Sequence, residues 1–171
     1  NKLVTSPLIT KGITSFIMFG GGDILCQMYF KDQSKKEESL DYKRALKQAS
    51  FGLAYTPYFH FSFNIMLPGL FNKPGTANLV KLVIFDQTFN STVFILCFFS
   101  YLDFFNGLGI KESLNKTKGL FLPTLVDNWK LWPLAQVINF TIIPPPYRVF
   151  FANIVGLFWN FWLSYIQNVR C

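Results

Sequence analysis

The chain has 171 residues, 51% of them hydrophobic, and a mean hydropathy of +0.30, which lies outside the ordinary soluble range and indicates an integral membrane protein. Its net charge of +7 comes from lysines and arginines between the apolar runs, which form no basic face interleaved with exposed aromatic residues. This pattern favours basic loops beside anionic lipid and argues against a nucleic-acid partner. The length suits one domain, so residues 1–171 are expected to form a single membrane unit.

The first apolar run, Leu8 to Phe30, has about 23 residues and is long enough for one helix to cross the hydrocarbon layer. Asp23 and Gln27 are about one helical turn apart and predict a polar side on this helix. Small residues on a neighbouring face predict close packing against another helix. These small residues are Gly12, Ser15, Gly22 and Cys26.

A charged stretch, Lys31 to Lys47, separates the first helix from the second. Its first half is expected to be a solvated loop, with Asp41 as the N-cap of the next helix. The second apolar helix runs from Ala45 to Leu70 and is interrupted by Pro57, which neighbouring helices can accommodate in a membrane. Small or polar residues at every fourth position predict a stripe along it. The stripe consists of Gly52, Thr56, His60 and Asn64, and the lone histidine favours a packing role over metal binding.

A third long apolar segment extends from Ala77 to Phe105 and carries Asp86 and Gln87 on one side. An aspartate at this depth costs a few kcal/mol unless it is paired or faces water. The following residues, Ile110 to Gly119, are polar enough to predict a separate interfacial amphipathic helix. The basic stretches Lys31–Lys47 and Ile110–Lys130 are expected to share the more positive compartment.

The segment from Trp129 to Ser164 predicts a helix, a proline corner at Pro144–Pro146, and a second helix antiparallel to the first. Leu131 to Ile143 is short for a bilayer, about 20 Å by helical rise, whereas Tyr147 to Gln167 is long enough by itself. The expected fold is therefore an all-α, multi-pass transmembrane bundle. It has four to five membrane helices and one interfacial amphipathic helix.

The same segment resembles the signature of the Mpv-seventeen family, which comprises the twenty-two-kilodalton peroxisomal membrane protein and mitochondrial inner-membrane relatives. The matching residues are Trp129, Trp132, Pro133, Gln136, Asn139, Phe140, Pro144, Arg148, Trp159, Leu163 and Ser164. Weaker matches lie upstream, where the family has G-D-x-x-x-Q, P-x-x-H and D-Q. They are Gly22-Asp23 with Gln27, Pro57 with His60, and Asp86-Gln87. The triple proline departs from the family, which usually has one.

The long helices each have a polar stripe, and two explanations compete: the stripes hydrogen-bond to each other, or they line a water-filled path. The residues at stake are Asp23, Gln27, His60, Asn64, Asp86, Gln87, Gln136, Asn139, Arg148 and Asn160. The chain has no nucleotide-binding loop, no nucleophile elbow and no paired Cys/His ligands, so we expect neither an enzyme nor a cofactor or metal site.

The resemblance implies a weakly selective channel or metabolite-homeostasis protein of the mitochondrial inner membrane, with the peroxisomal membrane as the alternative location. The competing hypothesis is a non-catalytic accessory subunit of a larger, respiratory-type complex in the inner membrane. The expected partners are membrane lipids, including anionic ones, and either further copies of the chain or the other subunits of such a complex.

Arg148 follows the proline corner, where an arginine must find water, lipid phosphate or a carboxylate. Asp86 is its favoured partner because it lies on the polar side of a helix, and because arginine can donate two parallel hydrogen bonds to one carboxylate. Asp103 is expected to reach water alone at a helix end.

Overall fold

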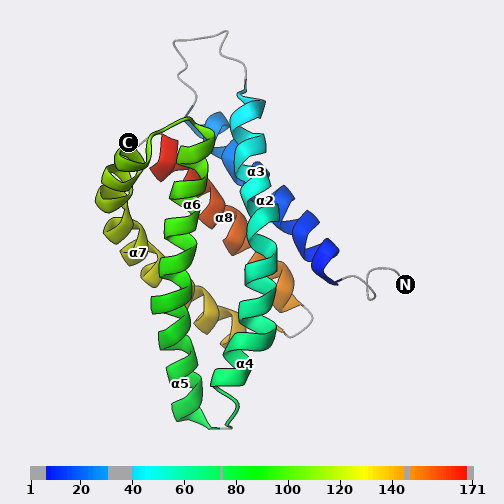
Figure 1. Cartoon of the computed structure of the whole chain (residues 1–171). Coiled ribbons are helices and arrows are strands. Elements are labelled where there is room, and N and C mark those ends of the chain that lie inside the picture. Colours follow the sequence, from blue (N-terminus) through cyan, green and yellow to red (C-terminus); the bar gives the residue numbers. More distant parts are fainter. Residues whose placement is uncertain (1–6, 31–39, 74, 145–146, 169–171) are drawn as a thin grey trace.

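A computed structural model describes residues 7–30, 40–73, 75–144 and 147–168, and every regular element among them is helical (Figure 1). The expected all-α class is therefore confirmed, whereas the first half of the Lys31–Lys47 loop lies outside the described residues. The elements are α2 (Pro7–Tyr29), α3 (Tyr42–Phe61), the π-helix η1 (Ser62–Met66), α4 (Leu67–Leu70), α5 (Thr76–Phe85), the π-helix η2 (Asp86–Asn90), α6 (Ser91–Phe105), α7 (Ile110–Thr141) and α8 (Arg148–Asn168).

Two long helical rods form a hairpin in the middle of the chain, each made of α-helical pieces joined through a π turn. The first rod begins where the Asp41 side chain accepts a hydrogen bond from the backbone N–H of Arg44 at 2.9 Å, as the N-cap prediction required. Its π turn ends directly before Leu67 and Pro68, and a proline there cannot donate the next helical hydrogen bond. The hairpin turn includes Gly75, whose φ of 128° is readily accessible only to glycine.

The prediction of a separate interfacial helix at Ile110–Gly119 is wrong, because α7 is one continuous helix of 32 residues. Its two internal prolines, Pro123 and Pro133, do not end it. Buried polar side chains repeat at helical spacing along α7, and the first two of them fall in the part that was expected to lie at the interface. These are Ser113, Thr117, Thr124 and Asn128. This stripe faces the bundle, where Ser113 and Asn128 hydrogen-bond to α6, so the polarity does not require contact with water.

The proline corner does separate two antiparallel helices, as predicted. Helix α7 ends at Thr141, α8 begins at Arg148, and Figure 1 shows the two running in opposite directions. Pro145 and Pro146 lie outside the described residues.

Helix α2 packs against both α3 and α8, and glycines permit both approaches. A Cβ on Gly52 of α3 would lie 2.7 Å from the backbone oxygen of Ser15, and one on Gly22 would lie 2.8 Å from the backbone nitrogen of Phe161. The predicted small-residue seam is thus confirmed, but it is shared between two neighbours rather than directed at one helix.

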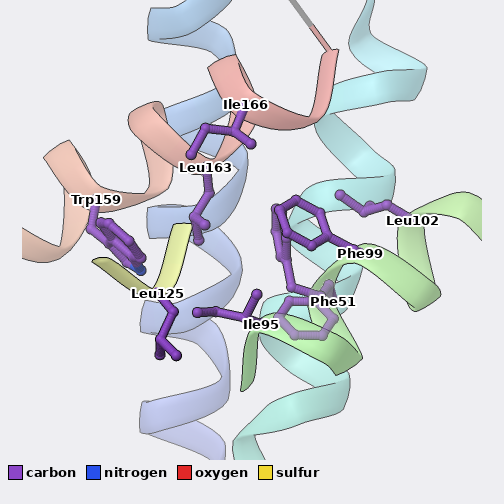
Figure 2. Close-up of a cluster of buried hydrophobic side chains, with 9 residues drawn as sticks. Phe51, Ile95, Phe99, Leu102, Leu125, Trp159, Leu163 and Ile166 are labelled. Carbon is purple, nitrogen blue, oxygen red and sulfur yellow. The ribbon is translucent and has the colours of Figure 1, made fainter. Parts of the chain in front are cut away.

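The centre of the bundle is filled by aromatic and aliphatic side chains, which Figure 2 shows between the helices. They come from α3, α6, α7 and α8 and are Phe51, Ile95, Phe98, Phe99, Leu102, Leu125, Trp159, Leu163 and Ile166. The rings of Phe51 and Phe98 meet edge to face, with centroids 5.2 Å apart, an arrangement that aromatic pairs prefer.

Two of the described helical stretches, Leu8–Tyr29 and Val80–Phe105, are long and apolar enough to cross a membrane by length and composition. Large apolar side chains are exposed on the remaining long helices as well, among them Leu53 of α3, Val137 of α7 and Phe150 of α8. The outward surface of the bundle is therefore apolar on several sides.

The close approach of α2 to α8 can be tested at Gly22. We expect Gly22→Ala to destabilise the protein by about 1 to 3 kcal/mol, because the added Cβ meets the Asn160 and Phe161 backbone at 2.8 Å and the helices must separate. Gly119→Ala in α7 is the matched control. No atom lies within 4 Å of its added Cβ, and replacing a helical glycine by alanine stabilises by about 0.5 to 1 kcal/mol. Thermal unfolding in detergent measures both variants, and equal melting temperatures would contradict the packing described here.

Candidate functional site

A cavity of about 440 Å³ lies between α2, α3, η2, α6, α7 and α8. Aromatic residues make up much of its wall, including Tyr55, Phe94, Trp132 and Trp159. The polar lining residues include Asp86, Gln87, Asn90, Gln136 and Asn160. The cavity therefore contains four of the ten residues predicted for the polar network, namely Asp86, Gln87, Gln136 and Asn160, together with Trp132 and Trp159 of the family signature.

Asp86 is the acidic group of this cavity, and its two oxygens accept hydrogen bonds from neutral amides. Asn90 Nδ2 donates to Oδ1 at 2.8 Å, and Gln87 Nε2 donates to Oδ2 at 3.3 Å. The carboxylate is half-buried and, among the described residues, belongs to no ion pair. Since a carboxylate can accept about four hydrogen bonds, acceptor capacity remains.

The two π turns meet beside this carboxylate. Ser62 Oγ, at the start of η1, donates to Asn90 Oδ1 at the end of η2 over 3.0 Å, and Tyr58 donates to the same oxygen at 3.0 Å. A π turn inserts an extra residue into a helix and shifts the side chains that follow, a device found often at functional sites. Here the inserted turns bring α3 and the Asp86 segment into hydrogen-bonding contact.

Helix α7 supports the Asp86 segment from the other side. Asn128 Nδ2 donates to Gln87 Oε1 at 3.2 Å and to Ser91 Oγ at 3.0 Å, and the Trp129 indole donates to the Gln87 backbone oxygen at 2.8 Å. The D-Q pair and the first tryptophan of the family signature are therefore parts of one contact. Nothing in the sequence spacing pointed to Asn128, because its partners lie 37 and 41 residues away.

Asp23 and Gln27 lie outside the cavity and form a separate polar cluster with α3 and α8. The Asp23 carboxylate is fully buried, and Arg44 Nε donates to its Oδ1 at 2.9 Å. Ser164 also donates to Oδ1, and Gln27 Nε2 donates to Oδ2 at 2.7 Å. Gln27 in turn bridges to the backbone of Asp41. The G-D-x-x-x-Q motif and the closing serine of the signature thus join three helices.

Asp103 forms a corresponding cluster between α6, α7 and α8, which corrects the expectation that it reaches water alone. It is fully buried, with Lys116 Nζ at 3.2 Å, Ser113 Oγ at 3.0 Å and Gln167 Nε2 at 2.8 Å. The continuous helix α7 is the physical reason, since its first turns fold back over the end of α6.

The pairing of Arg148 with Asp86 is also wrong. Asp86 is bound by amides, and Arg148 Nε donates to the backbone oxygen of Ile143 at 3.3 Å, across the corner. Among the described residues, the cations that reach fully buried carboxylates are Arg44 and Lys116, each within the first two turns of its helix. Both residues lie in basic stretches whose composition suggests contact with water, so the sequence did not indicate that they bind buried carboxylates.

The remaining predicted residues are scattered. His60 accepts from Lys11 Nζ at 3.2 Å and contacts Asn64, which also donates to the His60 backbone oxygen at 2.8 Å. Asn139 is buried on α7, Leu163 is in the core, and the side chain of Phe140 is not among those described. No group of three potential metal ligands occurs in the described ranges.

The chain is similar in sequence to a family of known proteins. The sequence model of the Mpv17 / PMP22 family matches residues 103–164. The chain is 37% identical to PXMP2/4 family protein 2 of Dictyostelium discoideum, over 94% of this chain and 84% of the relative. It is 34% identical to Protein sym1 of Aspergillus oryzae, over 98% and 94%, and 33% identical to Peroxisomal membrane protein 2 of Bos taurus, over 92% and 82%. No solved structure matches the chain.

The Asp23 cluster makes a quantitative prediction. We expect Arg44→Ala to destabilise the protein by about 3 to 5 kcal/mol, because it leaves a buried carboxylate without its cation. Lys130→Ala is the control, since Lys130 is 74% exposed and 3.8 Å from Asp127; its loss should cost under about 1 kcal/mol. The free energies of unfolding of Arg44→Ala, Asp23→Asn and the double variant, measured in detergent, give the coupling free energy between the two side chains. If the two single losses simply add, the buried pair contributes no coupling and the description is wrong.

Proposed function

This chain belongs to the Mpv17 / PMP22 family, as its motifs indicated, and we propose that it is a channel-like membrane protein whose solute pathway passes through the Asp86 cavity. The family relation shows that the chain is a membrane protein of this family. Weakly selective passage of small solutes is the finer function that we infer.

The cavity itself is the observation that carries this proposal. Helices that pack at 8–10 Å between axes normally fill the space between them with side chains. A volume of about 440 Å³ that Asp86 and several amide and hydroxyl side chains help to line instead leaves room for water or a small solute. This supports a pathway over the alternative in which the polar stripes only hydrogen-bond to each other.

Only part of the predicted stripes belongs to such a pathway. Beyond the cavity, the aromatic core and the Asp23 and Asp103 clusters occupy the bundle toward the other end. In this proposal the structure corresponds to a closed state, and opening requires these groups to separate or an oligomer to supply the rest of the path.

We place the protein in the mitochondrial inner membrane, with the peroxisomal membrane as the alternative that the name of the Bos taurus relative supports. Four to five membrane crossings remain our proposal. Two helical stretches meet the length and composition expected of a span, and the exposed apolar side chains on α3, α7 and α8 support the others.

A second candidate is an accessory subunit of a larger membrane complex. The observation in its favour is the aromatic outer surface, on which Phe104 and Tyr29 are 74% and 75% exposed. Aromatic side chains suit contact with both protein neighbours and lipid. Homo-oligomers and complexes with other subunits both fit this surface.

Planar-bilayer recording of the purified chain tests the pathway. We expect conductance above that of empty bilayers, and we expect Asp86→Asn to shift the reversal potential in a salt gradient away from cation preference, because it removes the charge and keeps the shape. Asp127→Asn is the control: Asp127 accepts from Trp162 at 3.1 Å and does not line the cavity. Absence of conductance, together with stoichiometric co-purification with a respiratory assembly in mild detergent, would instead favour the subunit.

A further inference from the structure

The charge of the cavity identifies the kind of solute that it can hold. Among the described residues that line it, Asp86 is the acidic one, and none is a lysine, arginine or histidine. Lys11 and His60 lie near by but contact each other at 3.2 Å and are not part of the wall. An anion inside this space would meet a carboxylate and no compensating cation.

The Asp86 carboxylate differs from the two fully buried aspartates, Asp23 and Asp103. Asp23 and Asp103 are each neutralised by a cation of the chain, Arg44 and Lys116 respectively. Within the described part of the chain, the Asp86 carboxylate accepts from the amides of Asn90 and Gln87, which supply hydrogen bonds but no charge. A carboxylate facing an apolar cavity without a counter-charge is strongly attractive to a cation, because the surroundings screen it poorly.

The rest of the wall suits an organic cation rather than a metal ion. Tyr55, Phe94, Trp132 and Trp159 present aromatic rings, whose faces attract ammonium groups and whose area accepts apolar parts of a ligand. A divalent metal would need several further oxygen, nitrogen or sulfur ligands, and no group of three acidic, histidine or cysteine residues lies within reach in the described ranges. The volume, about 440 Å³, falls in the range of small-molecule sites.

We propose that the cavity is a binding site for a single organic cation, an ammonium group attached to an apolar body, with the ammonium beside Asp86. The inference rests on the proposed function, because it names the solute class of the same cavity. Phe59 and Phe63, which line the cavity, are 52% and 41% exposed, so this part of the wall also reaches the surface. A free organic cation and the ammonium headgroup of a lipid share this chemistry.

The test measures equilibrium binding to the purified full chain in a neutral detergent, so it does not depend on conduction. Three probes of equal size are compared at constant ionic strength: benzyltrimethylammonium, its uncharged carbon isostere neopentylbenzene, and the anion benzylsulfonate. Fluorescence of Trp132 and Trp159 in the wall and equilibrium dialysis report binding. We expect the cation to bind at one site, at least about tenfold more tightly than the isostere, the factor that corresponds to one charge-assisted contact.

Two variants locate the site. Asp86→Asn should reduce binding of the cation to that of the isostere, while Asp127→Asn should not. Gly156→Leu should weaken the binding of the cation and of the isostere alike, because Gly156 lines the cavity and a larger side chain there would occupy part of it. The added Cβ meets no atom within 4 Å, so the variant can fold. Gly119→Leu, at an equally open helix position outside the wall, is its control.

Equal binding of cation and isostere to the unmodified chain overturns the proposal, even if Asp86→Asn fails to fold. Unchanged cation binding in a folded Asp86→Asn or Gly156→Leu variant overturns it as well. Displacement of the cation by dihexanoylphosphatidylcholine below its micelle concentration identifies a lipid headgroup as the natural source, and no displacement identifies a free cation. Binding of the cation without any conductance would support this site and reject the channel, so the two proposals fail separately.

Discussion

Three aspartates inside a helical bundle impose the main physical constraint on this protein, because a carboxylate removed from water must find a cation, hydrogen-bond donors or a hydrated space. Asp23 and Asp103 are fully buried and each meets a cation from the first turns of a following helix. Both clusters also bind the last turns of α8, through Ser164 and Gln167. The Asp23 cluster joins α8 to α2 and α3, and the Asp103 cluster joins it to α6 and α7. The need to pair each buried charge therefore determines which helix ends meet.

This requirement also orders the bundle along its length. The C-terminal ends of α2, α6 and α8 and the first turns of α3 and α7 lie at one end of the molecule (Figure 1), where Lys47 also reaches Asn106 at 2.9 Å. The described part of the first charged stretch, residues 40–47, therefore lies at the same end of the bundle as the first turns of α7. Toward the other end lies the cavity, where Asp86, the first residue of η2, is held by two amides of the same π turn. Buried ion pairs and a largely apolar cavity with one carboxylate thus occupy different depths of one bundle.

The family signature can be understood from this arrangement. Trp129 binds the backbone of the D-Q segment, Trp132 and Trp159 line the cavity, and Ser164 completes the Asp23 cluster. Gly22, directly before Asp23, allows α8 to approach so closely that the serine reaches the carboxylate. The signature therefore contributes to two structural units. Ser164 stabilises the Asp23 cluster at one end, across more than 100 positions of the chain, and the tryptophans line the cavity toward the other end.

Local features of the sequence determined the helical class, the N-cap at Asp41 and the break between Thr141 and Arg148, because run length, capping and proline act over a few residues. The signature residues between Trp129 and Ser164 carried the resemblance that identified the family. Tertiary structure alone decided which cation neutralises which carboxylate, since Arg44 and Lys116 resemble ordinary loop charges until the helices fold against α8. It also decided that α7 is one helix, because a polar stripe such as Ser113 to Asn128 has the same pattern whether it faces water or the buried hydrogen-bonding groups of its neighbours.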